Sequence, residues 1–179
     1  MSVVLRPWVG RDASALVAAA QSAPDLATQF GGADLSSLRA AEAFIEQSLR
    51  FDERMKSWAI VEDDVAVGNV AASAIEFRHE TAWRSYWLSL AARGKGYATS
   101  ALVSVSGWAF ESGLYRLELG HRVNNPASCR VATAAGFLAE GIEREKLRYG
   151  HERYDVETHA RLATDPVPAV TVPLILLMD

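Results

Sequence analysis

Residues 88–99 read LSLAARGKGYAT, in which an apolar segment leads into a short loop and a helix-forming stretch. The loop contains Gly94 and Gly96, with the cation Arg93 before them and the cation Lys95 between them. A helix N-terminus leaves backbone N–H groups unpaired and carries partial positive charge, so anions bind there. Glycine lets the backbone approach a phosphate closely and adopt a positive φ. The pattern therefore predicts a strand, a pyrophosphate-binding loop and a helix in succession.

Other phosphate-binding motifs fit this loop less well. The P-loop pattern G-x-x-x-x-G-K-[ST] is absent from the chain. The dinucleotide fingerprint G-x-G-x-x-G usually lies in the first strand–helix unit, whereas this loop lies in mid-chain and has Thr99 at the third glycine position. A tight strand-to-helix turn that binds no ligand is the remaining alternative.

Strand and helix patterns alternate on both sides of the loop. Strands are predicted at residues 3–6, 58–61, 65–75, 83–90, 116–122, 142–148 and 154–162. Helices are predicted at residues 13–20 after Asp12, from Ser36 or Ser37 to Leu49, at 97–110, and from Asn125-Pro126 to Gly136. This order predicts a mixed sheet with helices on both faces.

Length and composition indicate one domain at residues 1–163, followed by a linker and an apolar tail at 164–179. Cys129 is the only cysteine, so no intramolecular disulfide can form. The net charge of −4 argues against a nucleic-acid partner. The sequence shows neither a secretory signal nor a run of roughly 18 apolar residues, so we expect a cytoplasmic protein that does not enter membranes.

The glycine loop resembles the central motif of the GNAT superfamily of acyl-CoA-dependent N-acyltransferases. Residues 93–98, RGKGYA, match [Q/R]-x-x-G-x-[G/A] at every specified position. Further along, LYRLEL at 114–119, NPAS at 125–128 and AGFLAEG at 135–141 resemble the RimJ/RimL-type branch, which acetylates protein N-termini and other amines. The similarity extends in order over most of residues 3–162.

The resemblance implies an α/β (α+β) fold with a mixed, mostly antiparallel central sheet. Its two central strands, near residues 87–90 and 117–122, would splay apart and hold acetyl-CoA as co-substrate. Asn125 would lie near the pantetheine chain and Ser128 near the sulfur. The implied cofactor-binding residues are Leu88, Leu90, Arg93, Gly94, Lys95, Gly96, Tyr97, Ala98, Thr99, Asn125 and Ser128, and no metal is expected.

The expected catalytic residue is Ser128, as a proton donor to the leaving thiolate or as a sulfur contact. The alternative is a hydroxyl that serves the first turn of its helix. We expect Cys129 to be a buried helical side chain and not a nucleophile, because no partner that would lower its pKa is evident. Some RimL-type members carry a glutamate 19 residues after the serine, a position that Leu147 occupies here. The role of general base would then pass to water or to another residue. The candidates by residue type are Glu76, Glu118, His121, Glu143 and Glu145, and the sequence selects none of them.

These features together predict an N-acetyltransferase that transfers an acetyl group from acetyl-CoA to a primary amine by direct attack in a ternary complex. The acceptor would be a protein N-terminus or a small-molecule amine. An acyltransferase that uses another donor such as succinyl-CoA, and a non-catalytic CoA-binding module, remain alternatives. The apolar tail at residues 170–178 would dock on its own domain or on a partner subunit, and it favours a homodimer because it would otherwise expose apolar surface.

Overall fold

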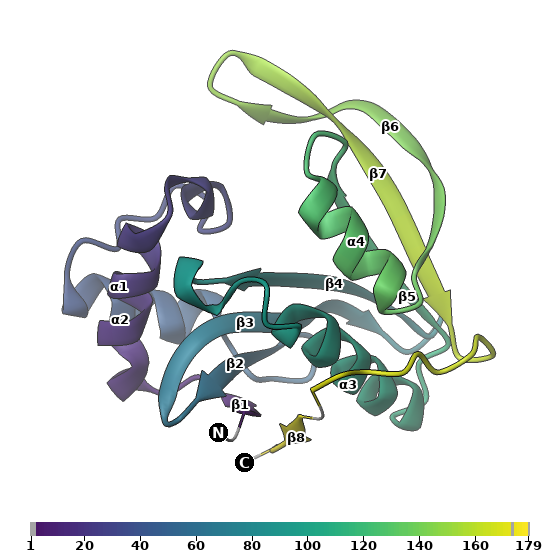
Figure 1. The fold of residues 1–179 in the computed structure, drawn as a ribbon, viewed down its shortest axis with the longest axis horizontal. Coiled ribbons are helices and arrows are strands. Elements are labelled where there is room, and N and C mark those ends of the chain that lie inside the picture. The colour runs from purple at the N-terminus through teal and green to yellow at the C-terminus, as the bar shows by residue number, and fades with distance from the viewer. Residues whose placement is uncertain (1–2, 173, 179) are drawn as a thin grey trace.

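The structure is a computed structural model that describes residues 3–172 and 174–178. Met1, Ser2, Asp179 and Pro173, the proline of the apolar tail, lie outside the described residues. The described residues form one eight-stranded sheet in the order β6-β7-β5-β4-β3-β2-β1-β8 (Figure 1). In chain order the elements, with η for 3₁₀ helices, are β1 (Val3–Pro7), η1 (Gly10–Asp12), α1 (Ala13–Ser22), η2 (Pro24–Thr28), α2 (Leu38–Ser48), β2 (Lys56–Glu62), β3 (Val65–Glu76), β4 (Thr81–Leu88), η3 (Leu90–Ala92), α3 (Tyr97–Glu111), β5 (Arg116–Arg122), α4 (Pro126–Ala134), β6 (Leu138–Tyr149), β7 (Glu152–Leu162) and β8 (Ile175–Leu176).

The sheet is mixed and mostly antiparallel, as predicted. Only the β4–β5 and β1–β8 pairs run parallel; every other neighbouring pair is antiparallel. Helices α1 and α2 cover one face, and α3 and α4 cover the other. Successive side chains of β2 point to opposite faces, so Trp58 and Ile60 pack on the α3 side while Ala59 and Val61 pack on the α1–α2 side. This two-sided burial explains why β2 reads as a continuous apolar run.

Local signals located most turns and caps correctly. Asp63 and Asp64 both have positive φ, 47° and 68°, in the predicted β2–β3 hairpin turn. Of the two serines proposed to cap α2, Ser37 does so, since its hydroxyl accepts a hydrogen bond from the N–H of Ala40 at 3.2 Å.

Two local predictions were wrong. Asp12 precedes α1 but makes no side-chain cap bond. Its carboxylate instead binds the guanidinium of Arg6 at 2.7 Å and the N–H of Val9 at 3.1 Å. The strand predicted to reach Leu90 ends at Leu88, because the chain turns there into the 3₁₀ helix η3.

The sheet opens between its two central strands, as expected. Parallel pairing of β4 with β5 covers only three positions, from Thr81 opposite Arg116 to Trp83 opposite Glu118. Beyond these pairs β4 continues beside β3, and β5 continues beside β7. Each strand is therefore held by its outer neighbour while the gap between them widens.

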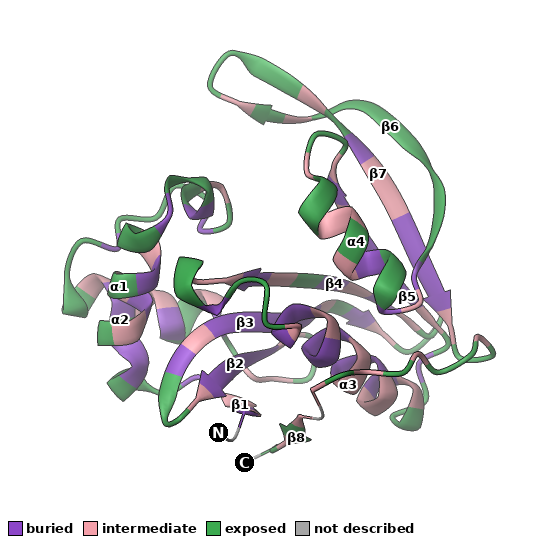
Figure 2. Ribbon diagram, viewed as in Figure 1, coloured by how far each residue is buried: buried purple, intermediate pink, exposed green. Residues whose placement is uncertain are grey.

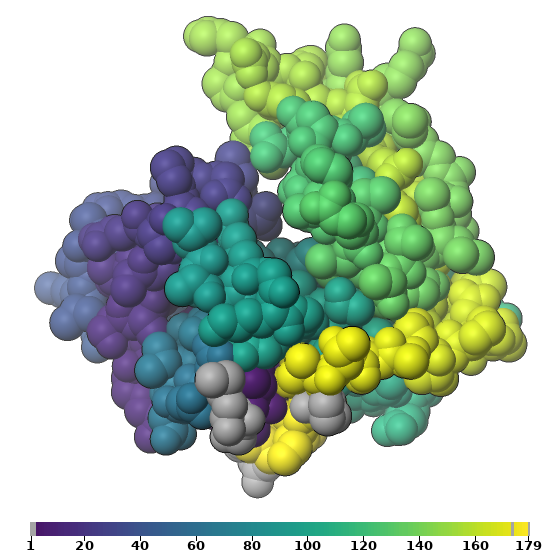
Figure 3. Space-filling model, in the orientation of Figure 1, coloured from purple at the N-terminus to yellow at the C-terminus, as the bar shows by residue number. Residues whose placement is uncertain are grey.

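The C-terminal tail docks on its own domain, which was one of its two predicted positions. It crosses α3 and ends in β8, which pairs with β1 (Figures 1 and 3). Val172, Leu174 and Leu176 pack against the core on the α3 side, whereas Ile175 is 63% exposed. None of the described helices combines the length and the apolar character that crossing a membrane would require.

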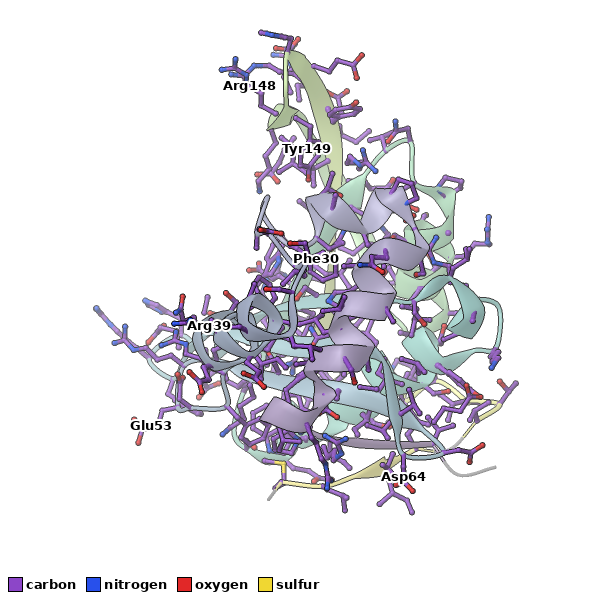
Figure 4. The ribbon with its side chains drawn as sticks, turned by 90° about the vertical axis from the view of Figure 1, so that its left-hand side faces the viewer. Phe30, Arg39, Glu53, Asp64, Arg148 and Tyr149 are labelled. Carbon is purple, nitrogen blue, oxygen red and sulfur yellow. The ribbon has the colours of Figure 1, made fainter. Side chains whose placement is uncertain are left out.

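The hairpin of β6 and β7 projects from the body of the molecule. Most of β6 is exposed (Figure 2). Arg148 and Tyr149 lie near its tip, far from the α1–α2 layer in which Arg39 lies (Figure 4).

Candidate active site between β4 and α4

A cleft of about 460 Å³ opens where β4 and β5 separate. Figure 3 shows the molecule hollowed between its N-terminal elements and α4. The walls come from η2, the end of β4, the start of α3 and α4. The lining residues are Asp25, Leu26, Gln29, Tyr86, Trp87, Leu88, Arg93, Gly94, Gly96, Tyr97, Ala98, Thr99, Asn125, Ala127, Ser128, Arg130, Val131 and Ala134.

The glycine loop forms one wall of the cleft. Gly94 and Gly96 have φ of 78° and 82°, a region that side chains other than glycine's rarely adopt. Gly96 is the N-cap of α3, and the N–H of Ser100 donates to its carbonyl at 3.1 Å. The N–H groups of residues 97–99 precede this first helical bond, so they have no acceptor within the helix. The loop thus presents unpaired backbone donors at a cleft, which is an arrangement that suits an anion.

The two cations of the loop are paired with carboxylates. The Arg93 guanidinium lies 2.9 Å from the Asp25 carboxylate, and it also donates to the carbonyl of Leu88 at 3.3 Å. The Lys95 ammonium lies 2.9 Å from Glu62. These pairs fix the loop to η2 and to β2, and they reduce the positive charge that it offers to a ligand.

Tyr97 strengthens the second of these pairs. Its hydroxyl donates to the Glu62 carboxylate, which therefore has two donors. The hydrogen bond from Tyr97, together with that from Lys95, lowers the pKa of Glu62 below its ordinary value. Glu62 thus remains an anion that tethers the start of α3.

The first turn of α4 forms the opposite wall. The side-chain oxygen of Asn125 accepts a hydrogen bond from the N–H of Ser128 at 3.2 Å and so caps the helix. Asn125 thus serves the first turn, and none of the hydrogen bonds between described residues uses the Ser128 hydroxyl. The alternative role for Ser128, a hydroxyl that serves its own helix, finds no support in this geometry.

Tyr86 joins the two walls. Its hydroxyl, on β4, donates to the backbone carbonyl of Ser128 at 3.0 Å. Burial raises the pKa of Tyr86 to about 12, so the phenol keeps its proton at neutral pH. Arg130 also lines the cleft and takes part in no ion pair between described residues. Arg130 is therefore a cation that a ligand anion can reach.

Two of the expected cofactor-binding residues do not line the cleft. Leu90 is exposed, and its N–H donates to the hydroxyl of Ser22 at 3.3 Å. The Lys95 side chain is turned towards Glu62. The other nine expected residues line the cleft: Leu88, Arg93, Gly94, Gly96, Tyr97, Ala98, Thr99, Asn125 and Ser128.

None of the five candidates for the general base lines the cleft. Glu76 accepts hydrogen bonds from backbone N–H groups, whereas Glu118 and Glu143 form ion pairs. Glu145 is exposed on β6, and His121 is buried beneath α4. Leu147, at the position of the family glutamate, pairs with Tyr154 in the β6–β7 hairpin.

The described lining residues therefore include one carboxylate, Asp25, and no histidine. Asp25 is engaged by Arg93. Sequence reasoning did not select Asp25, Gln29, Tyr86 or Arg130 as site residues. Tyr86 belongs to the segment Tyr86-Trp87-Leu88, which also resembles the family, but the resemblance assigned it no role. The other three belong to no motif with a recognisable spacing.

Comparison with known proteins agrees with this geometry. Residues 2–138 match the family model described as "Acetyltransferase (GNAT) domain". The chain is 32% identical over 108 residues to the ribosomal-protein-serine acetyltransferase of Escherichia coli (strain K12), which is 60% of each protein. It is 39% identical over 88 residues to the probable N-acetyltransferase YjcK of Bacillus subtilis (strain 168), covering 48% of this chain and 49% of that protein. The matched regions thus span only about half to three-fifths of these relatives.

Solved structures share the fold. The microcin C7 self-immunity acetyltransferase MccE, in complex with acetyl-CoA and AMP, superposes with a TM-score of 0.80 at 22% identity, over 90% of this chain and 92% of that one. The ribosomal L7/L12 α-N-protein acetyltransferase RimL, in complex with coenzyme A, also gives 0.80 at 21% identity, over 90% and 94% of the two chains. At these identities the likeness establishes the architecture alone.

Proposed function

The chain belongs to the GNAT acetyltransferase domain family, and on that premise we propose that it is an N-acetyltransferase that transfers an acetyl group from acetyl-CoA to a primary amine. The observation that carries the proposal is that the glycine loop and the first turn of α4 face each other across one cleft. Unpaired N–H groups at the start of α3 face a first turn of α4 whose Ser128 hydroxyl is free for a ligand.

The thioester donor would bind along both walls. The amides of residues 94–99 would hold the diphosphate, with Arg130 as an additional cation. The thioester supplies an electrophilic carbonyl carbon and a thiolate leaving group. The amine nitrogen would form its bond to the acetyl carbon, the carbon–sulfur bond would break, and Ser128 would donate its hydroxyl proton to the leaving thiolate. The proton that the nitrogen loses on becoming an amide would return to Ser128 through water, which restores the hydroxyl. The cleft contributes by holding both reactants in a fixed geometry.

The amine must lose a proton before it attacks. A lysine-type amine has a pKa near about 10.4, and an N-terminal amine a pKa near about 8. Because Asp25 is the one carboxylate among the described lining residues and is paired with Arg93, we propose that water takes this proton. The pH dependence of the rate should then follow the acceptor's own pKa. The rise of the rate with pH should therefore occur at higher pH for a lysine-type acceptor than for a peptide N-terminus. A rise that stays fixed near pH 6–7 for all acceptors would instead reveal a base on the protein.

We propose a protein N-terminus as the acceptor, supported by the relative named for ribosomal-protein serine. A small-molecule amine is the second candidate, and the fold is shared with an enzyme named as a spermidine N-acetyltransferase. The lone cysteine supports a cytoplasmic location. We also propose a homodimer. The support for it is that three apolar side chains of the docked tail are still exposed and could be covered by a second subunit: Ile175, Leu177 and Met178.

The test measures the appearance of free thiol from acetyl-CoA with peptides that begin with serine or alanine, and with a polyamine. Acetyl-CoA is compared with succinyl-CoA in parallel. The proposal predicts that the rate of thiol release depends on the acceptor and is higher with acetyl-CoA than with succinyl-CoA. In Ser128→Ala the rate of release should fall by a larger factor than the affinity for acetyl-CoA. Tight binding of CoA without release for any acceptor would indicate the non-catalytic module instead, and faster release from succinyl-CoA would indicate the other donor.

A further inference from the structure

Four metal-ligating side chains converge beneath α4, outside the residues that line the cleft. They are His121 of β5, Cys129 of α4, and Glu157 and His159 of β7. One potential ligand atom of each lies within 4.8 Å of those of the others. His121 is directly opposite Glu157 in the β5–β7 register, and His159 follows two positions later, so all three share the face that α4 covers. Both histidines are buried.

The backbone around the two histidines fixes their tautomers. Nδ1 of His121 lies 3.0 Å from the carbonyl oxygen of Arg122. Nδ1 of His159 lies 3.3 Å from the carbonyl oxygen of Phe137. A carbonyl oxygen can only accept, so each Nδ1 must carry the hydrogen. In a neutral imidazole the other nitrogen, Nε2, is then a lone-pair acceptor.

These Nε2 atoms point at each other and at a carboxylate. The two Nε2 atoms are 3.0 Å apart. Oε2 of Glu157 lies 3.0 Å from Nε2 of His159 and 3.3 Å from Nε2 of His121. Sγ of Cys129 lies 3.6 Å from the same Oε2. Three acceptors and a thiol thus converge in a largely buried place, where acceptors that face one another without a positive partner are costly.

A metal ion satisfies this arrangement more fully than a shared proton does. Without a metal, one proton on either ring can bridge two of the acceptors, while the Cys129 thiol donates a hydrogen bond to Glu157. A bound ion would engage all four groups at once. Zinc binds His nitrogen at about 2.0–2.1 Å, carboxylate oxygen at about 2.0–2.2 Å and thiolate at about 2.3 Å in a tetrahedron, whose ligands are then roughly 3.3–3.7 Å apart. Four of the six ligand separations are 3.0–3.6 Å, close to these edges, and all six are within 4.8 Å. The Nδ1–H bonds to backbone carbonyls are the outer contacts that zinc-binding histidines usually make.

We propose that His121, Cys129, Glu157 and His159 bind one Zn²⁺ and thereby fasten α4 to β5 and β7. Four protein ligands leave no open position, so the site is structural and not catalytic. Its consequence for the cleft is indirect, since α4 carries Asn125 and Ser128 in the turn next to Cys129. The sequence predicted no metal because ligands at these four positions do not follow the short spacings of known zinc motifs.

The experiment titrates the chelator-treated full chain with Co²⁺, which reports zinc sites by its absorption, and then with Zn²⁺. The proposal predicts one Co²⁺ per chain with the visible bands of tetrahedral coordination and a near-ultraviolet thiolate-to-cobalt band. Zn²⁺ should displace the Co²⁺ and raise the melting temperature. Cys129→Ser should lose the thiolate band, and His159→Gln should lose Co²⁺ binding altogether. The matched control His151→Gln, in the exposed β6–β7 turn, should bind as the unaltered chain does.

Two results would overturn the proposal. In the first, the unaltered chain is folded, as judged by circular dichroism, yet it gives no cobalt bands and melts at the same temperature with and without Zn²⁺. That result would indicate that the two histidines share a proton. Alternatively, Cys129→Ser would keep the full cobalt spectrum. Neither result depends on acetyl transfer, so a failure here is distinct from a failure of the proposed activity.

Discussion

The hydroxyl of Tyr86 donates a hydrogen bond of 3.0 Å to the backbone carbonyl of Ser128, across the opening of the central sheet. Backbone pairing between β4 and β5 has already ended at Trp83 and Glu118. The phenol therefore joins the β4 wall of the cleft to the α4 wall, in the region where β4 and β5 are no longer paired. We infer that this bond helps to set the width of the cleft.

Replacing Tyr86 with Phe should remove the tie while keeping the ring. We expect the free energy of unfolding to fall by about 0.5–1.5 kcal/mol, the usual net value of one hydrogen bond, and acetyl-CoA to bind more weakly. Urea denaturation and calorimetry measure the two effects. Tyr115→Phe is the control, because Tyr115 is 44% exposed and its hydroxyl makes no hydrogen bond to a described residue. Equal behaviour of the two variants would show that the tie does not matter.

Arg130 should contribute more to cofactor affinity than arginines that lie outside the cleft. It is a cleft cation without an ion pair among the described residues, so its charge is available to phosphate. We expect Arg130→Gln to weaken acetyl-CoA binding about tenfold, or about 1.4 kcal/mol, and to reduce the salt dependence of binding. Arg39→Gln, on the surface of α2 (Figure 4), should change neither. Equal affinities for both variants would exclude Arg130 from the site.

Glu62 should stabilise the glycine loop only while it is ionised. The hydrogen bond from Tyr97, then that from Lys95, lower the pKa of Glu62 from 4.5. A carboxyl group whose pKa is lower in the folded state stabilises the protein above its unfolded pKa, and this contribution is lost as the pH falls through the folded value. The melting temperature of Glu62→Gln should therefore lie below that of the unaltered chain near neutral pH, by an amount equivalent to about 1 kcal/mol or less. The difference should shrink below about pH 4.5, whereas exposed Glu42→Gln should show no such trend; a difference that persists in acid would contradict the assignment.

Arg84 is a buried cation with few partners. It is 1% exposed and donates to the carbonyl of Val105 at 3.1 Å, while its Nε and Nη1 atoms have no hydrogen-bond partner among the described residues. Burial lowers the pKa of Arg84 to about 9, so it is still charged at neutral pH. Arg84→Met should raise the free energy of unfolding, because it removes the cost of keeping a charge away from water. The expected gain is about 1–4 kcal/mol, the range for buried ion pairs that are replaced by apolar side chains. Thermal and urea unfolding measure the change. A loss of stability in Arg84→Met would mean that the interactions of the guanidinium outweigh the cost of burying its charge.

The sequence alone predicted those features that depend on local signals. The bounds of β5, the cap at Asn125 and the positive-φ glycines of the loop follow from side-chain periodicity, capping chemistry and glycine's freedom. The same signals fail where a distant partner competes. Asp12 has the chemistry of a cap, yet Arg6 of the neighbouring strand takes its carboxylate.

Contacts between residues far apart in the chain were beyond such reasoning. Asp25 and Arg93 are 68 residues apart, and Tyr86 and Ser128 are 42 apart. The sheet order brings them together, and no spacing in the sequence encodes that order. For the same reason His121 appeared only as an isolated candidate base, whereas the structure places it beside a second histidine.

Calorimetry with acetyl-CoA tests most directly whether backbone donors at the start of α3 grip the diphosphate. Gly94 is a better probe than Gly96, because a side chain at Gly96 would also approach Thr171 of the tail at 3.2 Å, whereas one at Gly94 would meet nothing within 4 Å. Gly113, at the other end of α3, is the matched control, since it too has a positive φ and open space around it. The account predicts that the unaltered chain and Gly113→Ala bind acetyl-CoA with similar affinity and that Gly94→Ala binds it more weakly. No heat of binding in the unaltered chain, or equal affinity in Gly94→Ala, would contradict it.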